Sequence, residues 1–297
     1  MSRPGINATL KPPIIAVVGV GLIGGSFAAA LKKFGGASHV IGVGRHAYSL
    51  NQAKSLGLID EVATLPEAAK KANVIMISTP VGVIPDVIEQ LKPFINTSTI
   101  ITDAGSTKHE IVNKARKILG SKSGHFVPGH PIAGSENAGP EAASPDLFKD
   151  RTVVLTPLEE NSSESIDTIV SLWEQCGARM VSMDPDIHDR ALASVSHVPH
   201  FLASVFMWQV ASADDSDLRL TLAGSGFRDF TRISAGSPEV WRDIFLANRD
   251  AVLLELTEFK EALEQAKAAL INSDAKSLEE FLDKAALARR LWGSRTK

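Results

Sequence analysis

The sequence predicts an α/β fold, a doubly wound and mostly parallel sheet, followed by an all-helical second half. Up to about residue 184, short and continuously apolar runs alternate with helical patterns. An unbroken apolar run is typical of a strand that is buried on both faces of a parallel sheet. After residue 184 no strand pattern recurs, and long helical patterns run to the end. We therefore expect two domains, residues 1–184 and residues 185–297.

The expected strands of the first domain end at polar or glycine-containing segments. They cover 14–18, 39–43, 73–79, 98–102, 125–129, 151–157 and 178–183. The expected helices cover 22–34, 47–56, 81–94, 106–119 and 162–177. Ser162 or Ser163 is the expected N-cap of the last helix, and Gly177 its end. In such a sheet the carboxyl ends of the strands share one edge, where α/β folds bind ligands.

The second domain is expected to begin with a helix that Asp184 caps and Pro185 opens. Residues 238–274 hold a long helical pattern in which apolar side chains such as Leu253 and Phe259 mix with charged ones. An apolar stripe in so small a domain needs a partner surface. We therefore expect a homodimer through the helical half.

Bulk composition excludes several classes of protein. The net charge is −3 and no basic stripe is present, which argues against a nucleic-acid partner. No uninterrupted apolar run reaches the ~20 residues of a membrane span, and the N-terminus lacks the apolar core of a signal peptide. The single Cys176 excludes an internal disulfide and fits a reducing compartment. The expected location is the cytoplasm.

The segment "VVGVGLIGGS" contains a Gly-x-Gly-x-x-Gly pattern between an apolar strand and a helix. In this context the pattern is the fingerprint of a Rossmann-type dinucleotide site. The first glycine permits the tight turn, the second lets the backbone approach a pyrophosphate, and the third lets helix and strand pack closely. The expected cofactor contacts are Gly19, Gly21, Leu22, Ile23 and Gly24. The alternative is a glycine-rich turn in another α/β fold.

The end of the second strand bears on which dinucleotide binds. An acidic residue there would accept hydrogen bonds from the adenosine ribose, but the chain has Gly44 followed by Arg45. A guanidinium can pair with a 2′-phosphate, so we favour NADP, or use of either NADP or NAD. The alternative is a solvated Arg45 in a protein that binds NAD through other contacts.

Two further strand ends supply candidate residues at the same edge. Ser78, Thr79 and Pro80 are expected to border the cofactor, although a plain strand–helix connection would look the same. In "ITDAGSTK", Asp103 either shapes the turn, which we favour, or contacts the cofactor. Ser106 either caps the next helix or turns its hydroxyl toward the nicotinamide and substrate.

His130 is the candidate catalytic residue. It lies in "FVPGHPIAGSENAG", where Pro131 restricts it to an extended backbone. An imidazole held there can accept a hydrogen bond from a substrate hydroxyl while hydride leaves the neighbouring carbon, because its unperturbed pKa is ~6.5. The alternative is a loop histidine that packs on the sheet.

Over nearly its whole length the chain resembles the prephenate/arogenate dehydrogenases of tyrosine biosynthesis. The resemblance lies in "VVGVGLIGGS", "DAGSTK", "PGHPIAGSENAGPEAASPDLF", "DPDIHDRALASVSHVPH" and "GFRDFTRISAGSPEVWRDI". It implies that His130 bonds the C4 hydroxyl of a cyclohexadiene ring. It also implies that Ser106 and Glu136 match the family's serine and glutamate.

The resemblance assigns the helical half to substrate binding. It implies that His197 and His200 line the pocket, that Arg232 binds a substrate carboxylate and that Trp241 is a pocket residue. For the histidines, core packing and a metal site are alternatives. A metal is disfavoured because no Cys or carboxylate cluster accompanies them. A Trp at helical spacing is also common in ordinary cores.

The implied reaction is oxidative decarboxylation of prephenate or arogenate, with hydride transfer to NAD(P)+. Two alternatives stay open. One is a β-hydroxyacid dehydrogenase of the same two-domain plan, which would normally offer a catalytic lysine in the helical domain. The other is a non-catalytic dinucleotide-sensing module. The sequence does not distinguish prephenate from arogenate.

Overall fold

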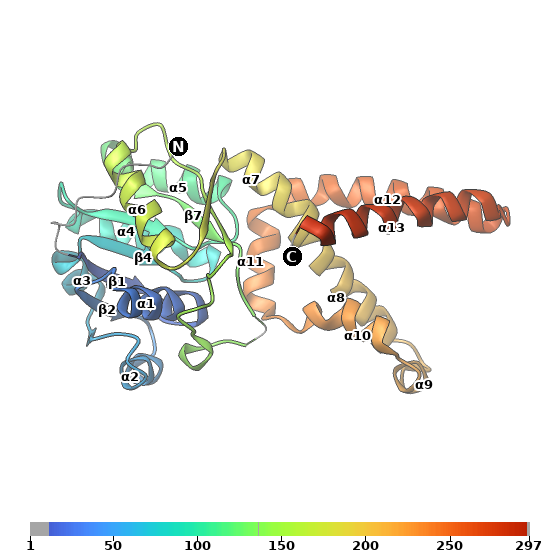
Figure 1. Ribbon diagram of the computed structural model, residues 1–297, viewed down its shortest axis with the longest axis horizontal. Coiled ribbons are helices and arrows are strands. Elements are labelled where there is room, and N and C mark those ends of the chain that lie inside the picture. The colour runs from blue at the N-terminus through green and yellow to red at the C-terminus, as the bar shows by residue number, and fades with distance from the viewer. Residues whose placement is uncertain (1–11, 136, 296–297) are drawn as a thin grey trace. The chain divides into compact units, whose positions relative to one another are not determined.

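A computed structural model describes residues 12–135 and 137–295 of the chain. The chain divides into two compact units, Met1–Asn248 and Arg249–Lys297. The first unit holds the described strands and the helices up to α11, and the second holds α12 and α13 (Figure 1). The expected order, an α/β part followed by helices alone, is confirmed.

Six strands of the first unit form a parallel sheet in the order β3-β2-β1-β4-β5-β6. They are β1 Ile14–Val18, β2 His39–Val43, β3 Glu61–Val62, β4 Val74–Ile77, β5 Ile100–Asp103 and β6 Phe126–Val127. The order reverses beside β1, which is the Rossmann arrangement. The doubly wound sheet expected from the sequence is therefore confirmed.

The register of the central strands brings their carboxyl ends to one edge. Val18 of β1 pairs with Val43 of β2 and Ile77 of β4, and Ile77 pairs with Asp103 of β5. The turns that follow these four strands therefore leave the sheet side by side, and they carry the glycine pattern and several of the candidate site residues.

Helices cover both faces of this sheet. They are α1 Leu22–Phe34, α2 Ala47–Ser55, α3 Leu65–Lys71, α4 Ile84–Leu91, α5 His109–Leu119 and α6 Ser163–Gln175. Short 3-10 turns are η1 Val81–Val83, η2 Lys92–Phe94, η3 Gly120–His125 and η4 Pro140–Ala142. Successive residues of β1 alternate between the faces. Ile15 and Val17 join the core that includes α1 and α6, and Ala16 and Val18 join the core that includes α3, α4 and α5.

The sequence patterns miss two short elements, β3 and α3. Strand β3 has only two residues, too few to show a pattern. Helix α3 has seven, with a proline in its first turn and only alanines buried. Local chemistry sets its start, because the Glu67 carboxylate accepts a 2.9 Å hydrogen bond from the Thr64 backbone N–H. Such a helix depends on its cap more than on an apolar stripe.

The last three strands correct the expectation of a single sheet. Strands β7 Gly129–Pro131, β8 Thr152–Leu155 and β9 Arg179–Ser182 form a separate sheet, in which β7 and β8 are antiparallel. The expected strand 125–129 is divided at Pro128, which has no N–H to donate to a ladder. The Pro128 carbonyl accepts from the Thr156 N–H instead, at 3.0 Å, so the chain turns toward β8.

The remainder of the first unit is helical. Its elements are α7 Pro185–Leu192, a π-helical turn η5 Ala193–His197, α8 Val198–Ala211, α9 Ser216–Thr221, α10 Ser225–Thr231, η6 Arg232–Ala235 and α11 Pro238–Ala247. The expected start is confirmed, since the Asp184 side chain accepts from the Asp186 N–H at 2.8 Å and Pro185 occupies the first turn. The expected Ser162 cap of α6 is also present.

The π turn at η5 has a local cause. Pro199 opens α8 and cannot donate a hydrogen bond to the carbonyl four residues earlier, and its ring would crowd that carbonyl. A wider turn gives the proline ring room and does not require the missing hydrogen bond. Such turns are frequent at functional sites. His197 ends this turn and His200 follows in α8, so the irregularity lies within the segment that carries both histidines.

One helical stretch, Pro185–Ala211, is by length and composition alone long enough and apolar enough to cross a membrane. This stretch contains no unbroken apolar run of such length, because charged and polar residues interrupt it. It carries four buried polar side chains, those of His188, Asp189, His197 and His200. Such groups are costly inside a bilayer, so they favour a helix that packs on protein.

The second unit is a pair of long helices, α12 Arg249–Ile271 and α13 Ala275–Arg295, which pack against each other. Many of their large apolar side chains are about half exposed. They include Leu253, Leu254, Phe259, Leu263, Phe281, Leu282, Leu287, Leu291 and Trp292. They form the apolar stripe for which we expect a partner surface.

Candidate active site

The glycine turn after β1 has the geometry of a pyrophosphate cradle. Gly19 has φ of 95° and donates its N–H to the Val43 carbonyl at 2.8 Å. A Cβ on Gly24 would overlap the Gly19 carbonyl oxygen, so only glycine lets α1 pack this closely. At Gly21, by contrast, no heavy atom lies within 4 Å of the position of a Cβ.

The N-terminus of α1 fits an anion. Gly21 is its N-cap and no side chain caps it, a helix start that suits an anion. Leu22 and Ile23 follow in the first turn and are partly exposed. The residues present therefore fit the pyrophosphate of a dinucleotide.

The neighbouring strand ends divide into structural and ligand-facing groups. The Ser78 hydroxyl donates to the Gly19 carbonyl at 2.8 Å and so holds the glycine turn. The Thr79 hydroxyl is buried and has no hydrogen-bond partner among the described residues, a state that favours a polar ligand atom there. Pro80 precedes η1, and Arg45 is exposed directly after Gly44.

Asp103 lies at the end of β5 and is fully buried. Its carboxylate accepts from the Gly105 N–H at 2.8 Å and from the Gly129 N–H at 3.1 Å, and it forms an ion pair with Lys108. The Lys108 ammonium also donates to the Gly129 carbonyl at 2.7 Å. Asp103 thus shapes the turn, and with Lys108 it ties the β5 end to the strand that carries His130.

A residue from the helical half caps α5. The Asp189 carboxylate of α7 accepts from the Lys108 N–H at 2.8 Å and from the His109 N–H at 2.9 Å. Ser106 supplies no side-chain cap to this helix. Its position instead borders the cavity described next, so of its two predicted roles the geometry favours the one toward a ligand.

A cavity of about 590 Å³ opens between the sheet edge and α7, α8 and α11. Six of the residues predicted to form the site line it: Ser106, His130, His197, His200, Arg232 and Trp241. They come from segments as far apart as the β5 turn and α11. The remaining lining is largely apolar, including Leu192, Val240 and Ile244. The volume suits a small ring-containing acid.

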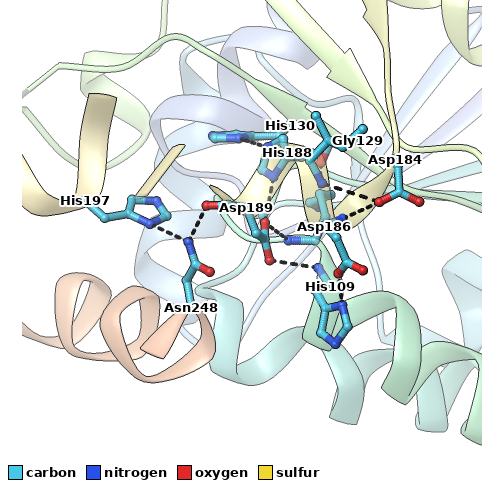
Figure 2. A network of polar contacts seen from close by, with 12 residues as sticks. His109, Gly129, His130, Asp184, Asp186, His188, Asp189, His197 and Asn248 are labelled. Carbon is cyan, nitrogen blue, oxygen red and sulfur yellow. Dashed lines mark hydrogen bonds and ion pairs between the residues drawn. The ribbon is translucent and has the colours of Figure 1, made fainter. Parts of the chain in front are cut away.

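His130 is part of β7 and is 8% exposed. Its Nδ1 lies 2.9 Å from Nε2 of His188, and Nδ1 of His188 lies 2.7 Å from Oδ1 of Asp189 (Figure 2). Burial, with the neighbouring His188 and Lys108, lowers the pKa of His130 well below its ordinary value. The imidazole is therefore neutral at neutral pH and can accept a proton or a hydrogen bond.

His197 supplies a hydrogen-bond donor, whereas His130 supplies an acceptor. The Asn248 amide Nδ2 donates to the Asp189 carbonyl at 2.7 Å and lies 3.0 Å from Nδ1 of His197. That nitrogen of His197 must therefore accept, which leaves its proton on Nε2. Nε2 is buried and has no partner among the described residues. Because burial lowers the pKa of His197 to about 4, the ring offers the cavity a neutral N–H donor.

His200 and Trp241 form a stacked wall of the cavity. Their ring centroids lie 3.4 Å apart with the planes 13° from parallel. Burial lowers the pKa of His200 to about 4, so this imidazole is also uncharged at neutral pH. Gly236 allows the close approach, because a Cβ there would lie 2.6 Å from Nε1 of Trp241.

Arg232 is the cavity's basic residue, and Glu136 lies outside the described residues. Arg232 begins η6, where its side chain is exposed and borders the opening. A guanidinium in this position suits a carboxylate, which it can bind through two parallel hydrogen bonds. No cluster of three or more potential metal ligands occurs in residues 12–135 and 137–295.

The sequence gives no sign of a functional role for His188, Asp189 or Asn248. The first two lie in "DPDIHDRA", which carries the family resemblance, but adjacent polar residues early in a helix look like a solvated face. Only burial distinguishes them, at 0% and 3% exposed. Asn248, the last residue of the first unit, gives no local signal at all.

A Rossmann sheet with a dinucleotide cradle, beside a cavity lined by neutral imidazoles and an arginine, defines a nicotinamide-dependent dehydrogenase. Two family models match the chain: "Prephenate dehydrogenase, nucleotide-binding domain" over residues 27–182 and "Prephenate dehydrogenase, dimerization domain" over residues 184–284. The chain belongs to the prephenate dehydrogenase family. The resemblance described from the sequence is thereby confirmed.

Individual relatives agree. A prephenate dehydrogenase of Lactococcus lactis is 33% identical over 91% of this chain and 74% of its own length. A cyclohexadienyl dehydrogenase of Zymomonas mobilis is 32% identical over 93% of this chain and 94% of its own. A crystal structure of prephenate dehydrogenase from A. aeolicus, in complex with hydroxyphenyl propionate and NAD+, has a TM-score of 0.89 and 31% identity, over 95% of this chain and 99% of that one.

The second and third glycines of the cradle, Gly21 and Gly24, should differ in their response to replacement by alanine. Gly21→Ala adds a methyl group to open space, so stability should persist while dinucleotide affinity falls at least about tenfold. Gly24→Ala should lower stability as well, because its methyl group meets the Gly19 carbonyl. Fluorescence titration with NAD+ and NADP+, and thermal unfolding, measure the two effects. Wild-type affinity in Gly21→Ala would contradict the cradle.

The neutral histidines should make the fold sensitive to acid. The pKa of His197 and of His200 is about 4 when folded, against an ordinary value of 6.5. Between these values the unfolded chain binds more protons, so the free energy of unfolding should fall as the pH falls from about 7 to about 5. Urea unfolding measures this. His200→Gln should reduce the difference, and the exposed His46→Gln should not; equal differences in both variants would argue against it.

Proposed function

We propose that this chain catalyses the oxidative decarboxylation of prephenate, of arogenate or of both. The observation that supports it most is the meeting of Ser106, His130 and Arg232 around one cavity at the dinucleotide edge. The products would be 4-hydroxyphenylpyruvate from prephenate and tyrosine from arogenate. Family membership sets the two alternative functions aside, since neither requires these three groups together.

The chain's own residues would polarise the substrate, bind it and exclude water from it. His130 accepts a hydrogen bond from the ring hydroxyl through its free nitrogen, and its neutral state at pH 7 makes this possible. Arg232 holds a carboxylate, and Ser106 lies beside the reacting carbon. His197 donates its Nε2–H to a substrate oxygen, and the His200–Trp241 stack closes one wall.

The reaction balances without an added oxidant beyond the dinucleotide. When bound, the nicotinamide would accept the hydride that leaves the hydroxyl-bearing ring carbon, C4, as its C–H bond breaks. The bond between the ring and its carboxylate breaks, carbon dioxide leaves, and the released electron pair completes the aromatic ring. The hydroxyl proton shared with His130 remains on the phenolic oxygen. Because aromatisation drives the reaction, the protein mainly orients groups and stabilises charge.

For the cofactor we propose NADP, with NAD as an alternative substrate of the same site. The support is the missing carboxylate at the β2 end and the exposed Arg45 beside Gly44. Leu22, Ile23, Thr79 and the N-terminus of α1 would contact the remainder of the dinucleotide, while Ser78 holds the turn.

For assembly we propose a homodimer through the helical half and a cytoplasmic location. The family model for residues 184–284 is described as a dimerization domain, and the exposed apolar side chains of α12 and α13 need a cover. We also propose a functional boundary near residue 184. There β9 has ended, Asp184 caps α7, and the two family models meet.

Steady-state kinetics tests the assignment. Absorbance at 340 nm, recorded with prephenate or arogenate and with NAD+ or NADP+, should show turnover in at least one combination.

His130→Asn should retain dinucleotide affinity and lose at least about 100-fold in kcat, because the acceptor for the ring hydroxyl is gone. An unchanged kcat in this variant would refute the role of His130.

Arg232→Gln tests the carboxylate contact separately. It should raise KM for the substrate at least about tenfold and change kcat less, because the guanidinium binds ground state and transition state alike. Arg228→Gln, four residues earlier and outside the cavity lining, is the matched control. A substrate KM equal to that of the wild type in Arg232→Gln would count against the contact.

A further inference from the structure

Behind His130, two buried side chains lead to a carboxylate. Nδ1 of His130, Nε2 of His188 and then Nδ1 of His188 and Oδ1 of Asp189 are joined at 2.9 and 2.7 Å. The three side chains lie in succession in Figure 2. They are 8%, 0% and 3% exposed. No solvent competes for these bonds, so the hydrogen-bonding state of each member constrains the next.

The direction of these bonds is set at Asp189. Its Oδ1 accepts from the Lys108 N–H and its Oδ2 from the His109 N–H, so both oxygens act as acceptors. Burial alone would raise the pKa of Asp189, but hydrogen bonds from His188 and from these two backbone groups hold it below its ordinary value. An ionised carboxylate cannot donate, so Nδ1 of His188 must carry the proton.

The remaining assignments follow from counting protons. A His188 ring that carries this proton alone has a lone pair on Nε2, which then accepts a hydrogen bond. Nδ1 of His130 then donates to it, which leaves Nε2 of His130 without a hydrogen. We call the hydrogen-bonded series His130–His188–Asp189 the relay. Nε2 of His130 is the ring nitrogen that the relay leaves free for the cavity. It is also the acceptor that the proposed reaction needs.

We propose that His188 and Asp189 are positioning residues that hold His130 in the tautomer with a bare Nε2. The inference rests on the proposed function for its purpose, but not for its geometry. Without the relay, neutral His130 could place its proton on Nε2 and would then meet the substrate hydroxyl as a donor. In serine proteases the corresponding aspartate, which also fixes a histidine tautomer, contributes about 10⁴-fold to kcat.

Asp189 orients two imidazoles of the cavity in different ways, one as a hydrogen-bond acceptor and one as a donor. Through its side chain, Asp189 leads to an acceptor at His130; through its backbone carbonyl and Asn248, it leads to a donor at His197. A hydroxyl and a carboxylate on one substrate would meet the groups that suit each of them. The relay is therefore a determinant of orientation as well as of reactivity.

Nitrogen-15 NMR of histidine-labelled wild-type protein tests the tautomer directly, with His130→Asn to assign the resonance. The free protein at neutral pH should show Nδ1 of His130 protonated and Nε2 unprotonated. A proton on Nε2 would overturn the proposal. This measurement needs no turnover, so it stands even if the protein oxidises neither prephenate nor arogenate.

Asp189→Asn tests the consequence, because an amide can donate to His188 and reverse the relay. We expect kcat to fall at least about 100-fold, with substrate and dinucleotide KM within about threefold of wild type, and the His130 resonances to lose the preference for protonated Nδ1. Asp186→Asn is the matched control, since it lies on the same helix, also contacts His109 and is exposed. It should behave as wild type.

Two outcomes for the variants would also overturn the proposal. One is a folded Asp189→Asn protein, checked by thermal unfolding, that keeps wild-type kcat. The other is an equal loss of kcat in Asp186→Asn and Asp189→Asn, which would reflect damage to α7 alone. If Asp189→Asn does not fold, the wild-type spectrum decides.

Discussion

The Asp189 carboxylate joins the two halves of the active site. It occupies the start of α5, where the first backbone N–H groups of the helix would otherwise have no acceptor. Because Asp189 belongs to α7, this contact sets the position of α7 against the turn that follows β5. Ser106, two residues before Lys108, and His130 both line the cavity. The cavity therefore has its shape because a helix of the second half caps a helix of the first.

A second constraint comes from the parallel sheet itself. Because of its register, four neighbouring strands end at one level, so the glycine cradle, Thr79 and Ser106 share an edge. Lys108 and Asp103 extend this order to β7, which belongs to the other sheet. A buried ion pair of this kind stabilises little by itself. Its effect here is to fix where the strand of His130 lies relative to the dinucleotide edge.

How much of this could be predicted depended on whether the signal was local. The strands β1 and β2 were predicted to the residue, because an apolar run buried on both faces is continuous in the sequence. The glycine pattern stood directly after one of them. The separate sheet of β7 to β9 was not predicted, since its pairing depends on which backbone N–H donates to the Pro128 carbonyl. That choice is made by tertiary contacts.

The candidate site shows the same division. His130, Ser106 and Arg232 could be proposed because they lie in stiff or distinctive segments that resemble a known family. His188 and Asp189 could not, because a histidine beside an aspartate in the first turns of a helix is ordinary on a surface. Their function depends on burial, which comes from packing against α5 and β7. Residues that act through other residues are visible only when the distances are known.

The π turn at Ala193–His197 has an evolutionary consequence. A π turn amounts to one additional residue in an α-helix, and each residue of an α-helix rotates the chain by about 100°. Loss of a single codon in this stretch would leave a continuous helix and an intact reading frame. Because the wide turn takes up its additional residue, His200 and the rest of α8 would keep nearly their present orientation toward Asp189. The turn is therefore a position at which lineages of this family should gain or lose one residue without rebuilding the helices on either side.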